Sequence, residues 1–187
     1  MTTFRRLAIP EVIEVTPAKH GDHRGFFSEV YKDAAFSAEG IEIRWVQDNH
    51  SYSAPAGTVR GCHFQVPPAA QDKLVRVLRG SIYDVAIDIR KGSPSYGRWV
   101  GCELSAEKWN QLLVPIGFAH AFMTLEPDTE VLYKVSAPYS KADERAILWN
   151  DPELGIDWPG LGPVTVTGKD RDAPRLADYD SPFVHQG

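Results

Sequence analysis

The stretch "VRGCHFQVPPAAQDKLVRVLRG", Val59 to Gly80, contains two runs rich in valine, leucine and phenylalanine on either side of a segment with two prolines. This composition indicates two β-strands joined by a turn. The same stretch holds one histidine, one lysine and three arginines. Because a charged side chain is costly to bury without a partner, those residues need an explanation.

Alternation along the two runs separates their side chains into faces, since successive residues of a strand point to opposite sides. Lys73 shares a face with Val75, whereas Leu74 and Arg76 share the other. In "GCHFQ", Gly61, His63 and Gln65 lie on one face, opposite Cys62 and Phe64. If the two strands are neighbours, a histidine, a glutamine and a lysine line one cavity. Arg76 and Arg79 receive no role and are expected to reach solvent.

Most of the chain has the same character. Short runs of Val, Ile, Leu and Tyr alternate with Gly, Pro, Asn and Asp: "VIEVTP", "GFFSEVY", "SIYDVAIDIR", "RWVGCELS", "QLLVPIG" and "EVLYKVS". Helix signals are confined to "YKDAAFSAEG", a turn or two ending at Gly40, and to "SAEKWNQL", where a serine precedes a glutamate as in a capped helix start. The pattern predicts an all-β sandwich or barrel of the jelly-roll kind, in one domain over residues 1–187, with short peripheral helices.

Composition narrows the functional classes. The 187 residues carry a formal net charge of -5, which argues against a nucleic-acid groove but allows a local basic pocket for one small anion. The two cysteines, Cys62 and Cys102, form no CxxC pair, and both lie in apolar strand-like contexts. With no signal peptide and no apolar run of about 18 residues, we expect a cytoplasmic protein with neither a nucleic acid nor a membrane as partner.

Seven motifs, in this order and spacing, resemble the dTDP-4-dehydrorhamnose 3,5-epimerase family. They are "RGFFSEVY", "QDNHSYS", "VRGCHFQ", "QDKLVRVLRGSIYDVAIDIRKGSPSYG", "VPIGFAHAF", "EVLYKVSAPYSKADERAILWNDPELGIDWP" and "TGKDRDAP". The similarity runs from about Ile9 to Leu176, and the long motifs make it specific. It implies the cupin fold, a β-jelly roll, and a homodimer. It also implies inversion of C3 and C5 of dTDP-4-dehydro-6-deoxy-D-glucose to give dTDP-4-dehydro-L-rhamnose.

The resemblance assigns three catalytic residues, and the chemistry of the reaction adds a fourth. His63 matches the family's base, and Asp170 in "GKDRDAP" matches the carboxylate that orients it. Lys73 suits the oxygen of an enolate, and Tyr133 in "EVLYKV" matches the proton donor on the other face of the sugar. Removal of a proton beside the C4 ketone creates such an enolate, so a base, a cation and an acid are required together. Cys62, where leucine is commoner, is interpreted as a packing residue.

Further positions match residues that contact the substrate in the family: Arg24, Phe27, Glu29, Gln47, Asn49, Arg60, His120, Tyr139, Glu144 and Lys169. Arg24 and Arg60 match residues that hold the diphosphate and nucleotide, since the planar guanidinium suits phosphate oxygens. Phe27 and Tyr139 are candidate aromatic contacts for thymine. In the family the nucleotide end is completed by an N-terminal segment of the second subunit, so Arg24 and Glu29 are expected to act across a dimer interface.

Cupins that bind a metal carry an HxH triplet, a following glutamate and a later histidine. Here the triplet is "HFQ", with Gln65 at the place of the second histidine, and no glutamate lies between Gln65 and Gly80. We therefore expect no metal and no organic cofactor. Two alternatives stay open: a relative that inverts only C3 or only C5 of another nucleotide-linked 4-keto-6-deoxy sugar, and a cupin that binds a sugar nucleotide without catalysis.

Overall fold

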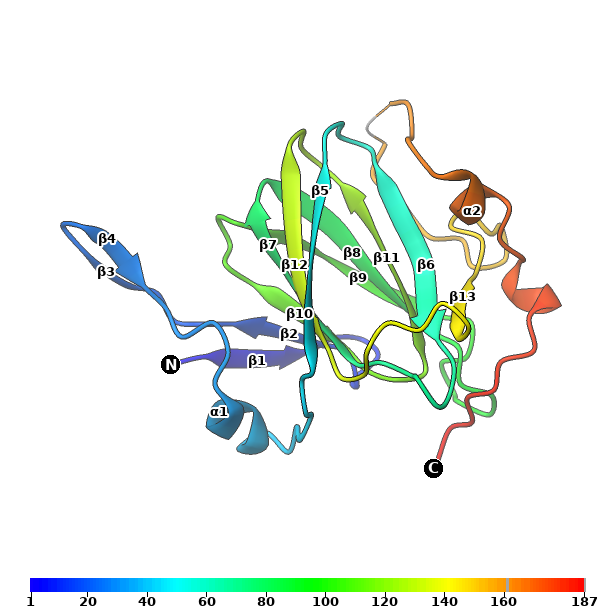
Figure 1. Ribbon diagram of the computed structural model, residues 1–187, viewed down its shortest axis with the longest axis horizontal. Helices are drawn as coiled ribbons and strands as arrows, with labels where there is room; N and C mark the ends of the chain where they lie inside the picture. Colours follow the sequence, from blue (N-terminus) through cyan, green and yellow to red (C-terminus); the bar gives the residue numbers. More distant parts are fainter. Residues whose placement is uncertain (161, 187) are drawn as a thin grey trace.

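The structure is a computed structural model that describes residues 1–160 and 162–186, and its centre is two β-sheets packed face to face (Figure 1). One sheet has the strand order β1 (Thr3–Arg6), β2 (Ile13–Thr16), β10 (Gln111–Val114), β7 (Lys73–Arg79), β12 (Thr129–Val135) and β5 (Gln47–Ser53). The other has the order β13 (Glu144–Ala146), β6 (Val59–Gln65), β11 (Phe118–Thr124), β8 (Ser81–Asp88) and β9 (Trp99–Ser105). All pairings in the two sheets are antiparallel, which confirms the predicted all-β jelly roll of the cupin type.

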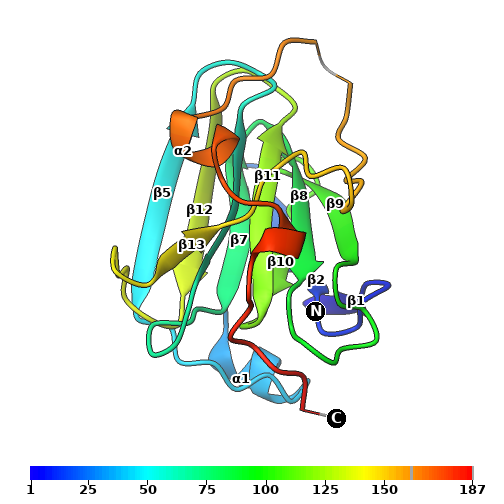
Figure 2. The same cartoon turned by 90° about the vertical axis from the view of Figure 1, so that its right-hand side faces the viewer.

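The strands β6 and β7 lie in different sheets, so the condition that the two strands are neighbours is not met. The segment between them, which contains Pro67 and Pro68, carries the chain from one sheet to the other (Figure 2). His63 and Lys73 still point into one space, because both project from facing sheets toward the interior. The alternation argument therefore predicted the shared cavity of His63, Gln65 and Lys73, which the two strands line from facing sheets.

Apolar side chains form three layers. The middle layer lies between the sheets and includes Val75, Ile82, Leu104 and Phe122. A second layer lies on the outer face of the five-stranded sheet, where Cys62 packs with residues of the C-terminal segment such as Phe183. The third covers the outer face of the six-stranded sheet: Ile13, Val15, Leu74, Leu113 and Phe36. Burial of apolar surface on both faces of each sheet fixes which residues point inward.

Helices are short and peripheral: α1 (Asp33–Ser37), α2 (Gly168–Arg171) and the 3-10 turn η1 (Leu176–Asp178). The element α1 confirms the helix predicted before Gly40. The helix predicted for "SAEKWNQL" is wrong, because Ser105 ends β9 and only a tight turn separates it from β10. Ser105 Oγ accepts the backbone N–H of Lys108 at 2.9 Å, so the serine caps a turn where the sequence suggested a helix.

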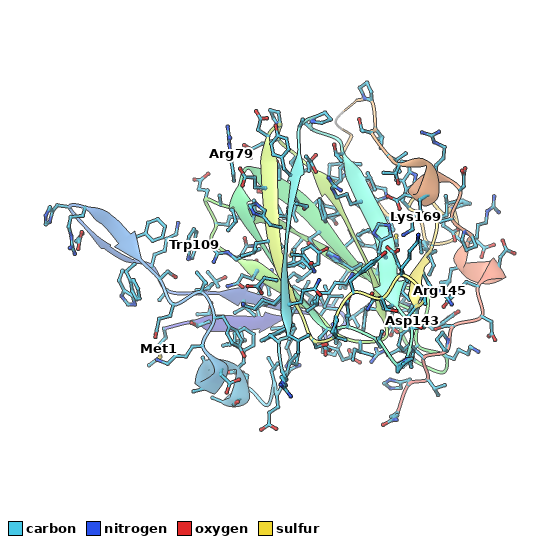
Figure 3. The ribbon with its side chains drawn as sticks, viewed as in Figure 1. Met1, Arg79, Trp109, Asp143, Arg145 and Lys169 are labelled. Carbon is cyan, nitrogen blue, oxygen red and sulfur yellow. The ribbon has the colours of Figure 1, made fainter. Side chains whose placement is uncertain are left out.

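A two-stranded hairpin, β3 (His20–Asp22) and β4 (Gly25–Phe27), projects away from the sheets (Figure 1). Its base rests on Trp109, whose ring carries the Lys19 ammonium at 4.1 Å and the Arg76 guanidinium at 4.8 Å. Arg76 therefore packs on an aromatic ring. Arg79 is exposed, and Figure 3 shows it at the edge of the molecule.

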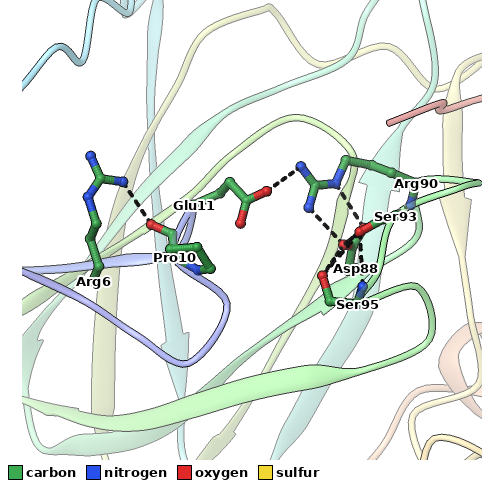
Figure 4. A network of polar contacts seen from close by, with 7 residues as sticks. All are labelled: Arg6, Pro10, Glu11, Asp88, Arg90, Ser93 and Ser95. Carbon is green, nitrogen blue, oxygen red and sulfur yellow. Dashed lines mark hydrogen bonds and ion pairs between the residues drawn. The ribbon is translucent and has the colours of Figure 1, made fainter. Parts of the chain in front are cut away.

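Asp88, at the end of β8, is fully buried and anchors a polar network (Figure 4). It accepts hydrogen bonds from Arg90 Nη2 at 2.7 Å, Ser93 Oγ at 2.5 Å and Ser95 Oγ at 2.7 Å. The other terminal nitrogen of Arg90 pairs with Glu11 at 2.8 Å, which ties this loop to the N-terminal segment. In the described part of the chain, no helix is long and apolar enough to span a membrane.

Candidate active site

A cavity of about 350 Å³ opens between the two sheets and collects side chains from both of them. Most of the residues predicted from the sequence line it: Asn49, Arg60, His63, Lys73, His120, Tyr133, Tyr139, Glu144, Lys169 and Asp170. They come from β5, β6, β7, β11, β12, β13, the segment before β13, and α2. The fold thus brings together residues that lie far apart in the chain.

His63 and Asp170 form the closest polar pair in this group, with 2.5 Å between Nε2 and Oδ1. Asp170 is only 2% exposed, and its backbone N–H is held by Thr167 Oγ1 at 3.3 Å, at the start of α2. Burial opposes ionisation of Asp170, but hydrogen bonding and attraction from His63 outweigh it and lower the pKa of the carboxyl. The carboxylate is thus charged near neutral pH and leaves the opposite ring nitrogen of His63 for the cavity.

Glycine at position 61 allows β6 to approach β11 closely beside His63. A Cβ there would lie 2.5 Å from the Ala121 Cβ and 2.6 Å from the His120 carbonyl oxygen. Its φ of 128° is also one that other residues rarely adopt. The glycine two residues before His63 is therefore required by the space between the strands.

Lys73 enters the cavity from the opposite sheet. Its side chain is buried, and Nζ donates to the backbone oxygen of His63 at 3.1 Å. Burial lowers the pKa of Lys73 to about 8, although nearby carboxylates counteract part of that effect. The lysine is therefore a cation at neutral pH in a water-poor site. Its inward position in "KLVRV" agrees with the alternation of that strand.

Tyr133 also comes from the six-stranded sheet, where β12 pairs with β7 and places it opposite Val75. Burial raises the pKa of its phenol, so the hydroxyl is protonated at neutral pH. His63 and Tyr133 therefore line the cavity from different sheets, one an imidazole paired with a carboxylate and the other a protonated phenol.

His120 is buried beside His63, and its Nε2 lies 2.9 Å from Oδ1 of Asp84. Sequence reasoning did not select Asp84. The signal was present, because Ile82, Asp84 and Ala86 alternate onto one face, which puts a carboxylate on an apolar interior side. The test that singled out Lys73 would have found Asp84 as well.

Polar groups ring the mouth of the cavity. Arg60 is held by Ser53 Oγ at 3.1 Å and by the Tyr52 carbonyl oxygen at 2.9 Å. Across the mouth, Glu144 pairs with Lys169 at 2.6 Å and accepts a hydrogen bond from the Tyr139 hydroxyl at 3.0 Å. Lys169 belongs to α2 and is labelled in Figure 3. The cations at this end favour an anionic group.

Gln65 occupies the place at which metal-binding cupins have a histidine, and backbone groups use its whole amide. Its Nε2 donates to the carbonyl oxygens of Ala69 at 2.6 Å and Pro138 at 3.1 Å. Its Oε1 accepts the N–H of Ser140 at 2.7 Å. Gln65 therefore fixes the loop that carries Tyr139. Among residues 1–160 and 162–186, no group of three His, Cys, Asp or Glu side chains is placed to hold a metal ion.

Four predicted residues do not line this cavity: Arg24, Phe27, Glu29 and Gln47. Arg24 pairs with Asp22 at 2.6 Å and its side chain is 78% exposed, on the hairpin. Phe27 is 68% exposed, and Glu29 pairs with the neighbouring Lys32. Gln47 acts on the site indirectly, because it donates to Asn49 Oδ1 at 2.7 Å and accepts the N–H of Tyr139 at 3.2 Å.

Other lining residues were not predicted: Ser51, Gln71, Phe122 and Thr167. Ser51 follows Asn49 on the same face of β5, and its buried hydroxyl has no hydrogen-bond partner in the described part of the chain. Period-2 alternation from Asn49 would have found it. Phe122 belongs to the middle apolar layer and resembles any core residue in sequence.

Comparison with known proteins points in one direction. The family model described as dTDP-4-dehydrorhamnose 3,5-epimerase matches residues 6–178. A relative of that name from Sinorhizobium fredii is 50% identical over 182 residues, covering 97% of this chain and 93% of its own. The crystal structure of dTDP-6-deoxy-D-glucose-3,5-epimerase from Legionella pneumophila, in complex with dTDP-4-keto-L-rhamnose, has a TM-score of 0.95 at 39% identity, with full coverage of both chains. An epimerase structure from Bacillus anthracis, with TDP and PPi bound, gives 0.90 at 46% identity and covers 94% of this chain and 99% of its own.

Proposed function

Because this chain belongs to the dTDP-4-dehydrorhamnose 3,5-epimerase family, we propose that its cavity inverts C3 and C5 of dTDP-4-dehydro-6-deoxy-D-glucose and releases dTDP-4-dehydro-L-rhamnose. The protein is an isomerase. One observation carries the assignment of its residues: a histidine paired with a buried aspartate faces a protonated tyrosine across the cavity, with a lysine between the two sheets. Inversion of a carbon needs a base on one face and an acid on the other.

In the proposed reaction, His63 removes the proton from the carbon next to the C4 ketone. The electron pair of that C–H bond moves to form the enolate, whose charge collects on the C4 oxygen. Asp170 stabilises the imidazolium that results and holds its ring in place. A positioned base of this kind contributes on the order of 10²- to 10⁴-fold to the rate.

Lys73 meets the enolate oxygen, where a cation in a water-poor site is worth roughly 3 to 4 kcal/mol. Tyr133 then donates its proton to the carbon from the opposite face, so that the ketone reforms with inverted configuration. Its phenol is protonated in the resting site, which suits this role. After release of the product, the proton on His63 exchanges with solvent and Tyr133 regains one.

The nucleotide end lies at the mouth. Arg60 and Lys169 supply positive charge for the diphosphate, while Asn49, Glu144 and His120 offer hydrogen-bonding groups to the nucleotide sugar. Tyr139, 57% exposed at the rim, offers a face on which thymine stacks.

We propose that the protein acts as a homodimer in the cytoplasm. The exposed hairpin supports this, because Arg24, Phe27 and Glu29 cannot serve the cavity of their own chain in this conformation. A second copy that lays its hairpin over the mouth would supply an arginine for the diphosphate and an aromatic ring for the base. Two cysteines without a disulfide agree with a reducing compartment.

Proton NMR in deuterated water tests the function directly. Purified protein is mixed with dTDP-4-dehydro-6-deoxy-D-glucose, and the C3 and C5 signals are followed while a reductase traps the L-rhamno product. Deuterium at both carbons, together with the L-rhamno product trapped by the reductase, establishes the 3,5-epimerase. Deuterium at one carbon, or none, contradicts the proposal.

A further inference from the structure

Asp84 is a buried carboxylate that the proposed reaction does not yet use. It is fully buried on β8, between Ile82 and Ala86 of the middle apolar layer, and it stands behind the wall of the cavity without lining it. Its Oδ1 contacts His120 Nε2 at 2.9 Å. Its Oδ2 has no hydrogen-bond partner in the described part of the chain. A buried carboxylate in apolar surroundings requires compensating charge.

That charge comes from the opposite sheet. Lys73 is buried and lines the cavity together with His120 and Phe122, of which the first contacts Asp84 and the second lies opposite it in the neighbouring strand, and the Asp84 charge raises the pKa of Lys73 against the effect of burial. We propose that Asp84 is a positioning residue of the epimerase: its charge keeps Lys73 protonated, and its hydrogen bond fixes the tautomer of His120. This inference rests on the proposed role of Lys73 at the enolate oxygen.

The charged and titratable groups facing Lys73 from the elements around it are Asp84, Cys62, His63, His120, Tyr133, Glu144 and Asp170. Most of these groups either are paired with another residue or carry no charge. Glu144 is paired with Lys169, and Asp170 is paired with His63. Burial raises the pKa of the Cys62 thiol to about 12, so it carries no charge at neutral pH. Of the three carboxylates, Asp84 is the one that no other cation holds within the described residues.

The same contact determines what His120 presents to the sugar. Burial lowers the pKa of His120, and so the ring is neutral in the resting site. Since a carboxylate only accepts, Nε2 must carry the proton that is donated to Asp84. Nδ1 is then an acceptor, and His120 receives a hydrogen bond from a sugar hydroxyl. With the tautomer unlocked, part of the population would present a donor instead.

The test is the pH profile of kcat for Asp84→Asn, which keeps the shape and an acceptor for His120 but removes the charge. We expect the alkaline limb of the profile to move to lower pH by about one unit or more, a tenfold or larger loss of kcat at the alkaline end. Asp84→Glu, which restores the charge, should return the limb toward its wild-type position. Asp88→Asn is the matched control, because Asp88 is equally buried on the same strand but bonded to Arg90, Ser93 and Ser95.

A direct readout accompanies the kinetics. In protein labelled with ¹³C at lysine Cε, the Lys73 signal, assigned with Lys73→Arg, should titrate at lower pH in Asp84→Asn than in wild type. Equal titration midpoints and superimposable pH profiles would overturn the inference, whatever the loss of kcat. If wild type itself catalyses no exchange at C3 or C5, the proposed function fails instead, while the titration of Lys73 still reports whether Asp84 controls its charge.

Discussion

His63 and Asp170 lie 107 positions apart in the chain, yet Nε2 of the histidine and Oδ1 of the aspartate are 2.5 Å apart. The pairing joins strand β6 of the five-stranded sheet to the short helix α2, which lies near the C-terminal end of the chain and packs against β6. The base of the proposed reaction therefore depends on a segment that follows the whole β-sandwich in the chain.

Substitution of either partner should abolish most activity without unfolding the protein. We expect His63→Ala to lose solvent exchange at C3 and C5, and Asp170→Asn to lower kcat by on the order of 10²-fold or more. NMR exchange rates measure both effects. Asp172→Asn, an exposed carboxylate at the end of the same helix, should behave as wild type. Near-wild-type exchange in His63→Ala would show that the base lies elsewhere.

Tyr133→Phe should separate proton removal from inversion. Without the phenolic proton, His63 can still take and return a proton on its own face, so deuterium enters while net epimerisation falls strongly. Exchange is read by NMR and inversion by the reductase-coupled assay. Tyr52→Phe is the control, since Tyr52 is 53% exposed on β5 and donates to Asp128. Unchanged inversion in Tyr133→Phe would assign the acid to another residue.

Activity should decline as pH rises through the pKa of Lys73, about 8, because the enolate then loses its cation. The sign follows from burial, which disfavours the ammonium and moves its titration below that of a free lysine. We expect an alkaline limb in kcat measured between about pH 6 and 10. Lys73→Gln should be impaired across the range and lack this limb. A wild-type profile flat through pH 9 would contradict the assignment.

Gln65→Leu should destabilise the fold and weaken substrate binding together. The substitution leaves the Ala69 and Pro138 carbonyls and the Ser140 N–H without their partner, and each hydrogen bond lost costs about 0.5–1.5 kcal/mol. Urea unfolding and KM are the measurements. Gln71→Leu, which removes one contact to the Ala137 carbonyl, is the milder comparison. Equal unfolding midpoints for Gln65→Leu and wild type would show that the amide does not hold the loop.

Chelation should leave the reaction intact. With Gln65 occupied by backbone groups, the family's proton transfers are expected to proceed without an ion. We expect dialysis against EDTA to leave kcat unchanged, with metal content measured by elemental analysis on the same sample. Loss of activity that returns on adding one divalent ion would overturn this expectation.

Local patterns in the sequence predicted the all-β fold and the interior faces of His63, Gln65 and Lys73, whereas the other candidate site residues came from the family resemblance. Alternation placed Lys73 and His63 on the interior faces of their strands. A shift of either strand by one residue would have turned the charged side chains toward an apolar layer. Alternation could not decide which sheet each strand joins, since the Pro67–Pro68 segment permits both a hairpin and a crossover. The helix expected at Ser105 failed because a tight turn uses the same capping serine. Alternation over Ile82, Asp84 and Ala86 also marks Asp84 as a carboxylate on an interior face, but its contact with His120 is visible only in the structure.

The base and the acid of the proposed reaction belong to different sheets, so the spacing between the two sheets sets the distance between these two groups. Side chains far from the sugar, such as Leu104 and Val77, act as spacers that set the reach from His63 to Tyr133. A substitution that changes the volume of the middle apolar layer therefore changes the distance between His63 and Tyr133, even where every polar group is kept. Looser packing of this layer at higher temperature is expected to stop turnover before the chain unfolds. Substitutions in the apolar layer alone would then adapt the enzyme to a hotter or a colder host.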